Sequence, residues 1–488
     1  MFHAFLLFII GVLLGLANLK PTFFILTPLI TPSLALLTFP DSSSSKLFKR
    51  LKLGWSFAFG YFLISLYWIP RCLLVNADQF LWLIPLTFFG IPAICALFMG
   101  ASWALIPWMR FSGVLRVFLF ALSWALMEAF LYLPVGGFPW SLLGYVWHRS
   151  LPIAQIAYPL TIHGLSFLTI LWGSSYYIWC SKRSKTGAIS SHLSPILIIL
   201  VLFLSFLGAY FWGLSRLAKP TKMHDVPSLR IVQPNIPQKI KWHPDYQQIN
   251  LKKILRLTYA PGYNSVDLII WPEAALTYRL TPSLLQFITK PLSAQQYLIT
   301  GILNDIKDDP LNVHNMLIAL NNEGTIIDQY RKHHLVPFGE YVPASDFLSR
   351  YLSINLQTLA GGAIQTLSGS KPETITLGPM INFSPQICFE TLFSNLVASN
   401  PSKPKWILNL TNDAWFGRST GPHQHVQISR FRAIQSNLPL VRAASTGISA
   451  IIDNHGQIIQ SLDSHVTGVI DYKKRPDPKI RSSLTGRL

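Results

Sequence analysis

The chain has 488 residues, enough for two sizeable folded units, and half of its residues are hydrophobic while only 12% are charged. That balance argues against a wholly soluble protein. The formal net charge of +19 could suggest nucleic acid, but no zinc-ligand spacing, aromatic RNA-binding motif or basic recognition helix accompanies it, so no nucleic-acid partner is expected.

Apolar runs dominate the chain up to about residue 214. A bilayer core needs roughly 20 apolar residues as a helix, and seven runs reach or approach that length: residues 2–18, 22–39, 55–74, 80–108, 115–133, 151–180 and 193–214. The first run has no basic start and is followed at once by the second, which favours a retained helical hairpin over a signal peptide. The sequence therefore predicts a membrane domain of about seven transmembrane helices over residues 1–215.

Basic residues follow alternate runs and predict the orientation. Clusters at residues 46–52 and 182–185 follow the second and sixth runs, and Arg110 and Arg116 flank the connection between the fourth and fifth. The intervening loops are poorer in basic residues. By the positive-inside rule the amino terminus is cytoplasmic, and an odd number of spans places everything after residue 214 outside the cytoplasm.

The second half of the chain mixes charged and apolar residues as a globular domain does. Residues 216–227 are polar and contain prolines, which is typical of a linker. Helical patterns cover residues 244–259 and 423–437, and short β-branched runs recur at residues 229–232, 266–271, 297–302, 315–320, 325–329, 406–410 and 448–452. Strands that alternate with helices predict a layered α/β or α+β sandwich over residues 228–472, followed by a basic polar tail at residues 473–488.

The cysteines predict no disulfide framework. Cys72, Cys95 and Cys180 lie in or beside apolar runs, which leaves Cys388 alone in the globular part. A small buried hydrophobe is the commoner fate of a free cysteine, but an unpaired thiol in a domain that faces an oxidising compartment is a candidate nucleophile.

Three local sequences in the globular domain could carry chemistry. An apolar strand at residues 267–271 ends at a proline and presents Glu273, a second strand runs into an aromatic and glycine-rich loop with Lys332, and a third strand ends at Cys388. Strand ends are where α/β folds place reactive groups, and a helix amino terminus after Cys388 would stabilise its thiolate. Each residue alone has an ordinary structural explanation, but together they indicate a cysteine nucleophile with a base and a cation.

Histidines could suggest a metal instead. His333 and His334 are adjacent, and His423 and His425 lie two residues apart, but no third ligand with a recognised spacing supports zinc. Neither a metal nor a cofactor is expected.

The three motifs resemble the Glu-Lys-Cys triad of the nitrilase superfamily, in the same chain order. The multi-span amino-terminal region makes the apolipoprotein N-acyltransferases, the membrane-embedded branch, the most similar family. Residues 232–238 resemble the opening motif of that family's soluble domain, and Glu128 and residues 137–140 match its membrane part. The resemblance implies an αββα sandwich for the soluble domain, joined to a multi-span α-helical membrane domain.

The resemblance also implies roles for individual residues. Glu273 would be the base, Lys332 the triad lysine that stabilises the oxyanion, and Cys388 the nucleophile. Glu340 and Glu390 match supporting carboxylates of the family, and the main-chain N–H of Phe389 is expected to assist Lys332. Trp242 matches a residue associated with substrate engagement, and the apolar loop residues Phe338, Tyr341, Trp415 and Phe416 are expected to contact lipid and exclude water.

By the same resemblance, the acyl donor is a phospholipid and the acceptor is the α-amine of a diacylglyceryl-modified lipoprotein. The location it implies is the bacterial inner membrane, with the catalytic domain on the periplasmic side. One departure from the family pattern concerns the carboxyl terminus, where the polar tail at residues 473–488 stands in place of a final membrane helix.

Two other functions use the same sequence features. A membrane-tethered amidase or nitrile hydrolase would need the same triad, but it would not need seven spans or apolar loops suited to lipid. A transporter or scaffold with an inactive outer domain is disfavoured because all three triad positions hold the required residue types.

Overall fold

A computed structural model describes residues 1–19, 27–38, 46–105, 111, 113–131, 138–183, 193–306, 309–341, 365–379, 381–398 and 403–474. The contacts divide the chain into two compact units, Met1–Lys219 and Pro220–Leu488. The boundary falls within the predicted linker, although the last membrane-unit helix continues to Leu217.

The first unit is helical. In its described part the elements are α1 (Phe2–Leu16), α2 (Thr27–Thr38), α3 (Leu47–Ser65), η2 (Ile69–Asn76), α4 (Ala77–Phe80), η3 (Leu81–Leu83), η4 (Leu86–Gly90), α5 (Ile91–Leu105), α6 (Gly113–Phe130), η6 (Leu143–Arg149), α7 (Leu151–Ala154), α8 (Ala157–Gly173), α9 (Ser175–Arg183) and α10 (Leu193–Leu217). Every predicted apolar run therefore contains helix, which confirms the helical character of this half.

Fewer of these helices are long enough to cross a bilayer than the seven predicted runs. Among the described residues, three continuous helices qualify by length and composition, Leu86–Leu105, Gly113–Phe130 and Pro195–Leu217, and a pair bent by 50° between Ser65 and Ile69 adds a fourth. The sixth predicted run is divided into α7, α8 and α9, and Thr161 inside α8 has a φ of 63° that interrupts the helix. Parts of the second run lie outside the described residues, so the count of seven stays a prediction.

Glycines bring α1 and α3 into close contact. A Cβ atom added to Gly11 would lie 2.0 Å from the carbonyl oxygen of Phe57, and one added to Gly60 would lie 2.2 Å from that of Phe8. Small residues at such crossings let helix backbones approach within a membrane, where packing rather than water exclusion drives association.

Glu128 is a fully buried carboxylate on α6. Its Oε1 accepts hydrogen bonds from the Trp124 indole at 2.8 Å and from the main-chain N–H of Leu143 at 2.6 Å, and His163 lies 3.6 Å from its Oε2. The carboxylate therefore orients the start of η6, just after Trp140. Residues 137–140 are the segment predicted to match the membrane part of the family, and Gly137 among them lies outside the described residues.

The second unit contains two β-sheets. The first has the strand order β13-β1-β2-β3-β4-β5, with β6 beside β4, and the second has the order β12-β11-β10-β9-β8-β7. Their strands are β1 (Leu229–Gln233), β2 (Leu268–Ile270), β3 (Tyr297–Ile306), β4 (Asp309–Leu320), β5 (Ile326–Arg331), β6 (Gln365–Thr366), β7 (Ile375–Leu377), β8 (Ile381–Ile387), β9 (Trp406–Thr411), β10 (Leu440–Ala444), β11 (Ser449–Ile452), β12 (Ile458–Leu462) and β13 (Gly468–Tyr472). All the predicted strands are present.

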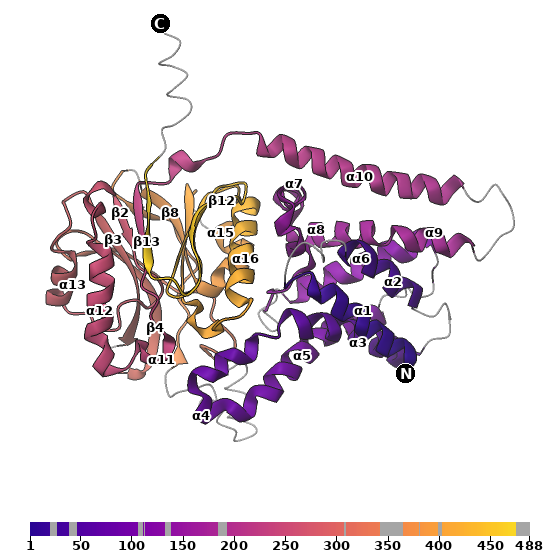
Figure 1. Ribbon diagram of the computed structural model, residues 1–488, viewed down its shortest axis with the longest axis horizontal. Helices are drawn as coiled ribbons and strands as arrows, with labels where there is room; N and C mark the ends of the chain where they lie inside the picture. Colours follow the sequence, from indigo (N-terminus) through magenta and orange to yellow (C-terminus); the bar gives the residue numbers. More distant parts are fainter. Residues whose placement is uncertain are drawn as a thin grey trace, which may run out of the picture. The chain divides into compact units, whose positions relative to one another are not determined.

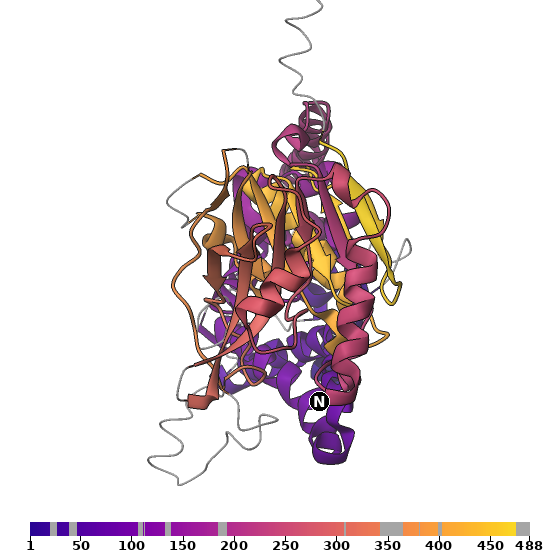
Figure 2. The ribbon, with the colours of Figure 1, turned by 90° about the vertical axis from the view of Figure 1, so that its left-hand side faces the viewer.

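Helices cover the outer faces of the two sheets, so the unit has four layers, as predicted (Figures 1 and 2). Side chains of both sheets, among them Ile270, Leu317 and Trp406, form the central core. A second core packs the first sheet against α12 (Pro244–Thr258) and α13 (Pro282–Thr289), and a third packs the second sheet against α16 (Gly421–Ser436). The short helices η8 (Met223–Asp225), α11 (Gln238–Lys241), η9 (Tyr263–Ser265), η11 (Cys388–Leu392), α15 (Ser394–Ala398) and η12 (Asp413–Phe416) occupy the connections.

The first and last strands of this unit are neighbours. β1 pairs antiparallel with β13 along Leu229–Gln233, and the buried guanidinium of Arg230 bonds both carboxylate oxygens of Asp471 at 2.7 Å. The Tyr472 hydroxyl donates to the carbonyl of Met223, which ties the end of the unit to its beginning.

Candidate active site

Glu273 follows β2, after Trp271 and Pro272, and is only 7% exposed. Its Oε1 accepts a hydrogen bond from the Asn315 amide at 2.8 Å. The next residue, Ala274, has a φ of 47°, a conformation that costs a non-glycine residue free energy. Gly301 on β3 allows this turn, because a Cβ there would lie 2.6 Å from the Cα of Glu273.

Lys332 lies one residue beyond β5 and is almost fully buried. Its Nζ donates to Glu340 Oε1 at 2.8 Å and lies 3.7 Å from Glu273 Oε1. Burial alone would lower the pKa of this ammonium, but the carboxylates of Glu340 and Glu273 outweigh burial and raise it. Lys332 is therefore a fixed positive charge between two carboxylates.

Cys388 follows β8 and begins η11, with a φ of 51°. The Asn409 amide donates to its carbonyl at 3.3 Å, and the Thr411 hydroxyl contacts its thiol. Burial, and after it the charge of Glu273, raises the pKa of the thiol in spite of Lys332. The helix that follows, η11, is five residues of 3-10 helix, and stabilisation of the thiolate by its amino terminus stays a prediction. A base must remove the proton.

Glu390 joins the two strand ends that present Lys332 and Cys388. Fully buried, it accepts hydrogen bonds from the Tyr330 hydroxyl at 2.6 Å, from the main-chain N–H groups of His333 and His334 at 2.8 and 3.0 Å, and from that of Ile387 at 2.6 Å. The first three donors lie at the end of β5 and the last at the end of β8. Glu390 thus connects the end of β5 in the first sheet to the end of β8 in the second.

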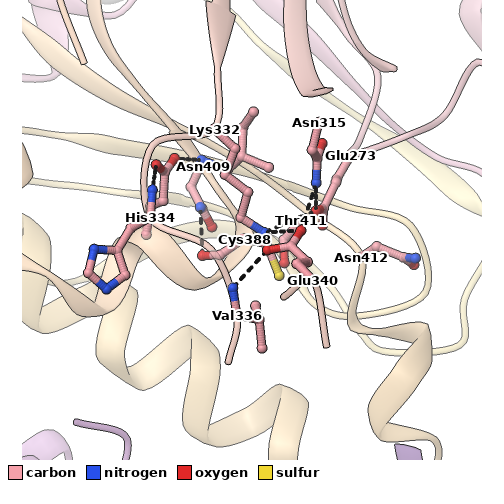
Figure 3. A network of polar contacts seen from close by, with 12 residues as sticks. Glu273, Asn315, Lys332, His334, Val336, Glu340, Cys388, Asn409, Thr411 and Asn412 are labelled. Atoms are coloured by element: carbon pink, nitrogen blue, oxygen red, sulfur yellow. Dashed lines mark hydrogen bonds and ion pairs between the residues drawn. The ribbon is translucent and has the colours of Figure 1, made fainter. Parts of the chain in front are cut away.

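Four of the predicted site residues converge, as Figure 3 shows: the side chains of Glu273, Lys332 and Glu340 surround the sulfur of Cys388. Glu340 also accepts the main-chain N–H of Val336 at 2.8 Å and lies 3.3 Å from the Asn315 amide. A thiol, a carboxylate within the same cluster and a fixed ammonium are the parts required for nucleophilic attack, proton abstraction and oxyanion stabilisation.

The aromatic residues predicted to contact substrate differ in their surroundings. Phe338, Trp415 and Trp242 are 66%, 40% and 39% exposed, which is unusual for large apolar side chains. Tyr341 is partly buried, and its carbonyl accepts the N–H of Phe338 at 2.7 Å. Phe389, by contrast, is buried against Phe393 and the ring of His334. Its side chain is core, and the proposed role of its N–H stays a prediction.

Four polar residues that contact the site carry no predicted role. Asn315, Asn409 and Thr411 lie inside strands, and Lys241 lies in the four-residue helix α11, where its Nζ donates to the carbonyl of Glu273 at 3.1 Å. Polar side chains in otherwise apolar strands were the available signal for the first three. Nothing in the local sequence distinguishes Lys241 from its neighbour Lys239.

The described part of the chain contains no group of three or more potential metal ligands. His425 lies instead 2.9 Å from the buried Asp413, and His333 faces the carbonyl of Gly369 at 2.8 Å.

Two family models match the chain. A carbon-nitrogen hydrolase model covers residues 228–473, and an apolipoprotein N-acyltransferase amino-terminal domain model covers residues 10–175. The two matches fall in the second and first unit, respectively.

Relatives align over most of their length. Proteins named apolipoprotein N-acyltransferase from Rhodopseudomonas palustris, Brucella melitensis and Rickettsia typhi are 34%, 33% and 33% identical, over 86%, 87% and 96% of this chain and 79%, 80% and 91% of theirs. Among solved structures, an amidase from Nesterenkonia sp. is 15% identical, with a TM-score of 0.37 over 52% of this chain and 95% of its own.

Proposed function

The chain belongs to the apolipoprotein N-acyltransferase family, and from this membership we propose how its site works: Cys388 carries the acyl group as a thioester between a phospholipid donor and a lipoprotein amine. The chain is an acyltransferase that N-acylates lipoproteins. The single observation that supports the assignment of Cys388 is the position of its partly buried thiol, beside the carboxylate of Glu273 and the fixed ammonium of Lys332.

The first half-reaction forms the thioester. Glu273 accepts the thiol proton, and the sulfur attacks the ester carbonyl of the phospholipid. Lys332, together with the N–H of Phe389, stabilises the oxyanion. When the intermediate collapses, the carbon–oxygen bond breaks, Glu273 returns the proton to the departing oxygen, and a lysophospholipid leaves.

The second half-reaction forms the amide. The α-amine of a diacylglyceryl-cysteine attacks the thioester carbonyl, Glu273 accepts a proton from the amine, and the carbon–sulfur bond breaks. The proton then passes to the thiolate, which restores the resting site. The exposed side chains of Phe338, Trp242 and Trp415 suit contact with acyl chains, and their cover would favour the amine over water as acceptor.

We further propose that the protein resides in the bacterial inner membrane with its catalytic unit on the periplasmic side. The apolar helices support membrane association, and the basic loops between the apolar runs support this orientation.

Acyl transfer through Cys388 predicts an isolable acyl-enzyme. Purified protein incubated with phospholipid and no acceptor should gain one fatty-acyl mass on the Cys388 peptide by mass spectrometry, and neutral hydroxylamine should remove it. A diacylglyceryl-cysteine peptide should then discharge the acyl group onto its amine, whereas release of free fatty acid alone would indicate a hydrolase.

Substitutions separate the roles at the site. Cys388→Ala should abolish the adduct, while Glu273→Gln and Lys332→Met should each slow its formation roughly hundredfold or more. Cys180→Ala, in the helical unit, is the matched control and should form the adduct at the normal rate. Acyl mass on another residue, or transfer by Cys388→Ala, would overturn the assignment.

A further inference from the structure

Lys241 is a second buried lysine beside the triad. Its residue is 2% exposed, and among the residues that the structure describes its Nζ finds the carbonyl oxygen of Glu273 at 3.1 Å. An ammonium removed from water costs free energy that one neutral carbonyl does not recover. A methionine would fill the same space without that cost, so the positive charge itself calls for an explanation.

The hydrogen bond from Lys241 reaches the main chain next to an unfavourable backbone conformation. Glu273 precedes Ala274, whose φ of 47° is unfavourable for a residue with a Cβ. The Gly301 strand supports this turn from one side, and Lys241 holds the Glu273 carbonyl. Lys241 therefore helps to set the direction in which the Glu273 side chain leaves the main chain.

The charge of Lys241 also acts on the reacting groups. Burial lowers the pKa of Lys241 to about 8, while the charges of Glu273 and of the Cys388 thiolate oppose that change. The Lys241 ammonium is therefore close enough to interact electrostatically with both reacting groups. Its other neighbour is the ring of Trp242, 5.9 Å from Nζ.

Several other groups face the Glu273 carboxylate. Lys332 lies 3.7 Å away, the Asn315 amide donates to it, and Glu340 shares both of these partners. The Cys388 thiol is a further titratable group at the site, and the negative charge of Asp413 contributes to its raised pKa. Lys332 is thus the ammonium beside both carboxylates, Glu340 and Glu273. These three groups together carry one more negative than positive charge, and the ammonium of Lys241 offsets that difference.

We propose that Lys241 is a positioning residue of the acyltransferase site, which orients Glu273 through its carbonyl and offsets the negative charge of the two carboxylates there. The inference rests on the proposed thioester mechanism. In both half-reactions Glu273 must begin as a carboxylate, and a nearby positive charge supports that role.

The test compares three variants by the rate of acyl-adduct formation on Cys388 across pH. Lys241→Met should lower the rate roughly tenfold or more and move the acidic limb of the profile to higher pH, because the site loses a positive charge beside the carboxylate. Lys241→Gln keeps a donor for the Glu273 carbonyl without the charge. It should recover part of the rate while the acidic limb stays displaced.

Lys239→Met is the matched control, since Lys239 is an exposed lysine of the same helix α11, and its profile should coincide with that of the unsubstituted protein. The inference is overturned if neither Lys241 variant moves the acidic limb, if Lys239→Met moves it equally, or if the only change is a higher KM for phospholipid. Melting temperatures identify a variant that fails to fold, in which case Lys241→Gln carries the test. Adduct formation by the unsubstituted protein is scored separately, so a failure here leaves the thioester mechanism intact.

Discussion

At the residue scale, a chain of hydrogen bonds between buried polar groups supports the turn at Cys388, whose φ is positive. The Cys388 carbonyl accepts from Asn409, whose Oδ1 accepts from Arg442 at 2.5 Å, and Arg442 in turn donates to Asp413 at 2.8 Å. Arg442 and Asp413 are both fully buried, and His425 completes the cluster. The position of Cys388, the proposed nucleophile, thus depends on a buried ion pair to which Asn409 links it.

Arg442→Met should therefore destabilise the soluble unit by about 3–5 kcal/mol, because it leaves the Asp413 carboxylate buried without its cation. A lowered melting temperature and slower adduct formation on Cys388 would be seen together. Arg256→Met, on the exposed face of α12, should change neither.

The same variant has a pH signature. Arg442 holds the pKa of Asp413 well below its usual range against the effect of burial, so the pair stabilises the fold above about pH 4, the unfolded value, and this contribution is lost as the pH falls further. Without Arg442, burial raises the pKa of Asp413, and protonation of this carboxyl removes the unpaired buried charge that destabilises the variant. The difference in melting temperature between the two proteins should therefore narrow from pH 7 toward pH 4, and a constant difference would contradict this account.

At the element scale, the crossing of α1 and α3 depends on two glycines, Gly11 and Gly60. Gly11→Ala would place a methyl group 2.0 Å from the Phe57 carbonyl oxygen, so the helices must separate and the melting temperature in detergent should fall. Gly208→Ala on α10 is the matched control, since a Cβ there meets nothing within 4 Å. Equal melting temperatures for the two variants would show that the crossing tolerates a wider separation.

The same scale shows what sequence patterns can and cannot predict. Strand ends predicted Glu273, Lys332 and Cys388 because period-two apolar runs stop where the chain leaves the sheet. The pattern missed β10, where buried Arg442 interrupts the apolar run, and β13, which is partly exposed at a sheet edge. The ion pair of Arg442 with Asp413 and the contact of Lys241 with Glu273 exist only after distant segments pack, so no local spacing reports them.

At the scale of the whole molecule, the arrangement of basic loops predicts where the second unit lies. Alkaline phosphatase, which is active only outside the cytoplasm, should be active when fused after Leu488 and inactive when inserted after Lys185, within the basic connection. The opposite pattern would overturn the predicted orientation together with the proposed periplasmic location.

The pairing of β1 with β13 also imposes an order in time. β1 is the first strand of its sheet to be synthesised and β13 is the last, so one side of β1 has no neighbour until residues 468–472 have emerged. An open strand edge beside a hydrophobic core invites pairing with other chains. The sheet therefore cannot be completed progressively during synthesis. Its edge is covered only when β13 has been made, and a chain that stops a few residues short of β13 would contain Glu273, Lys332 and Cys388 in a unit whose first sheet keeps an open edge.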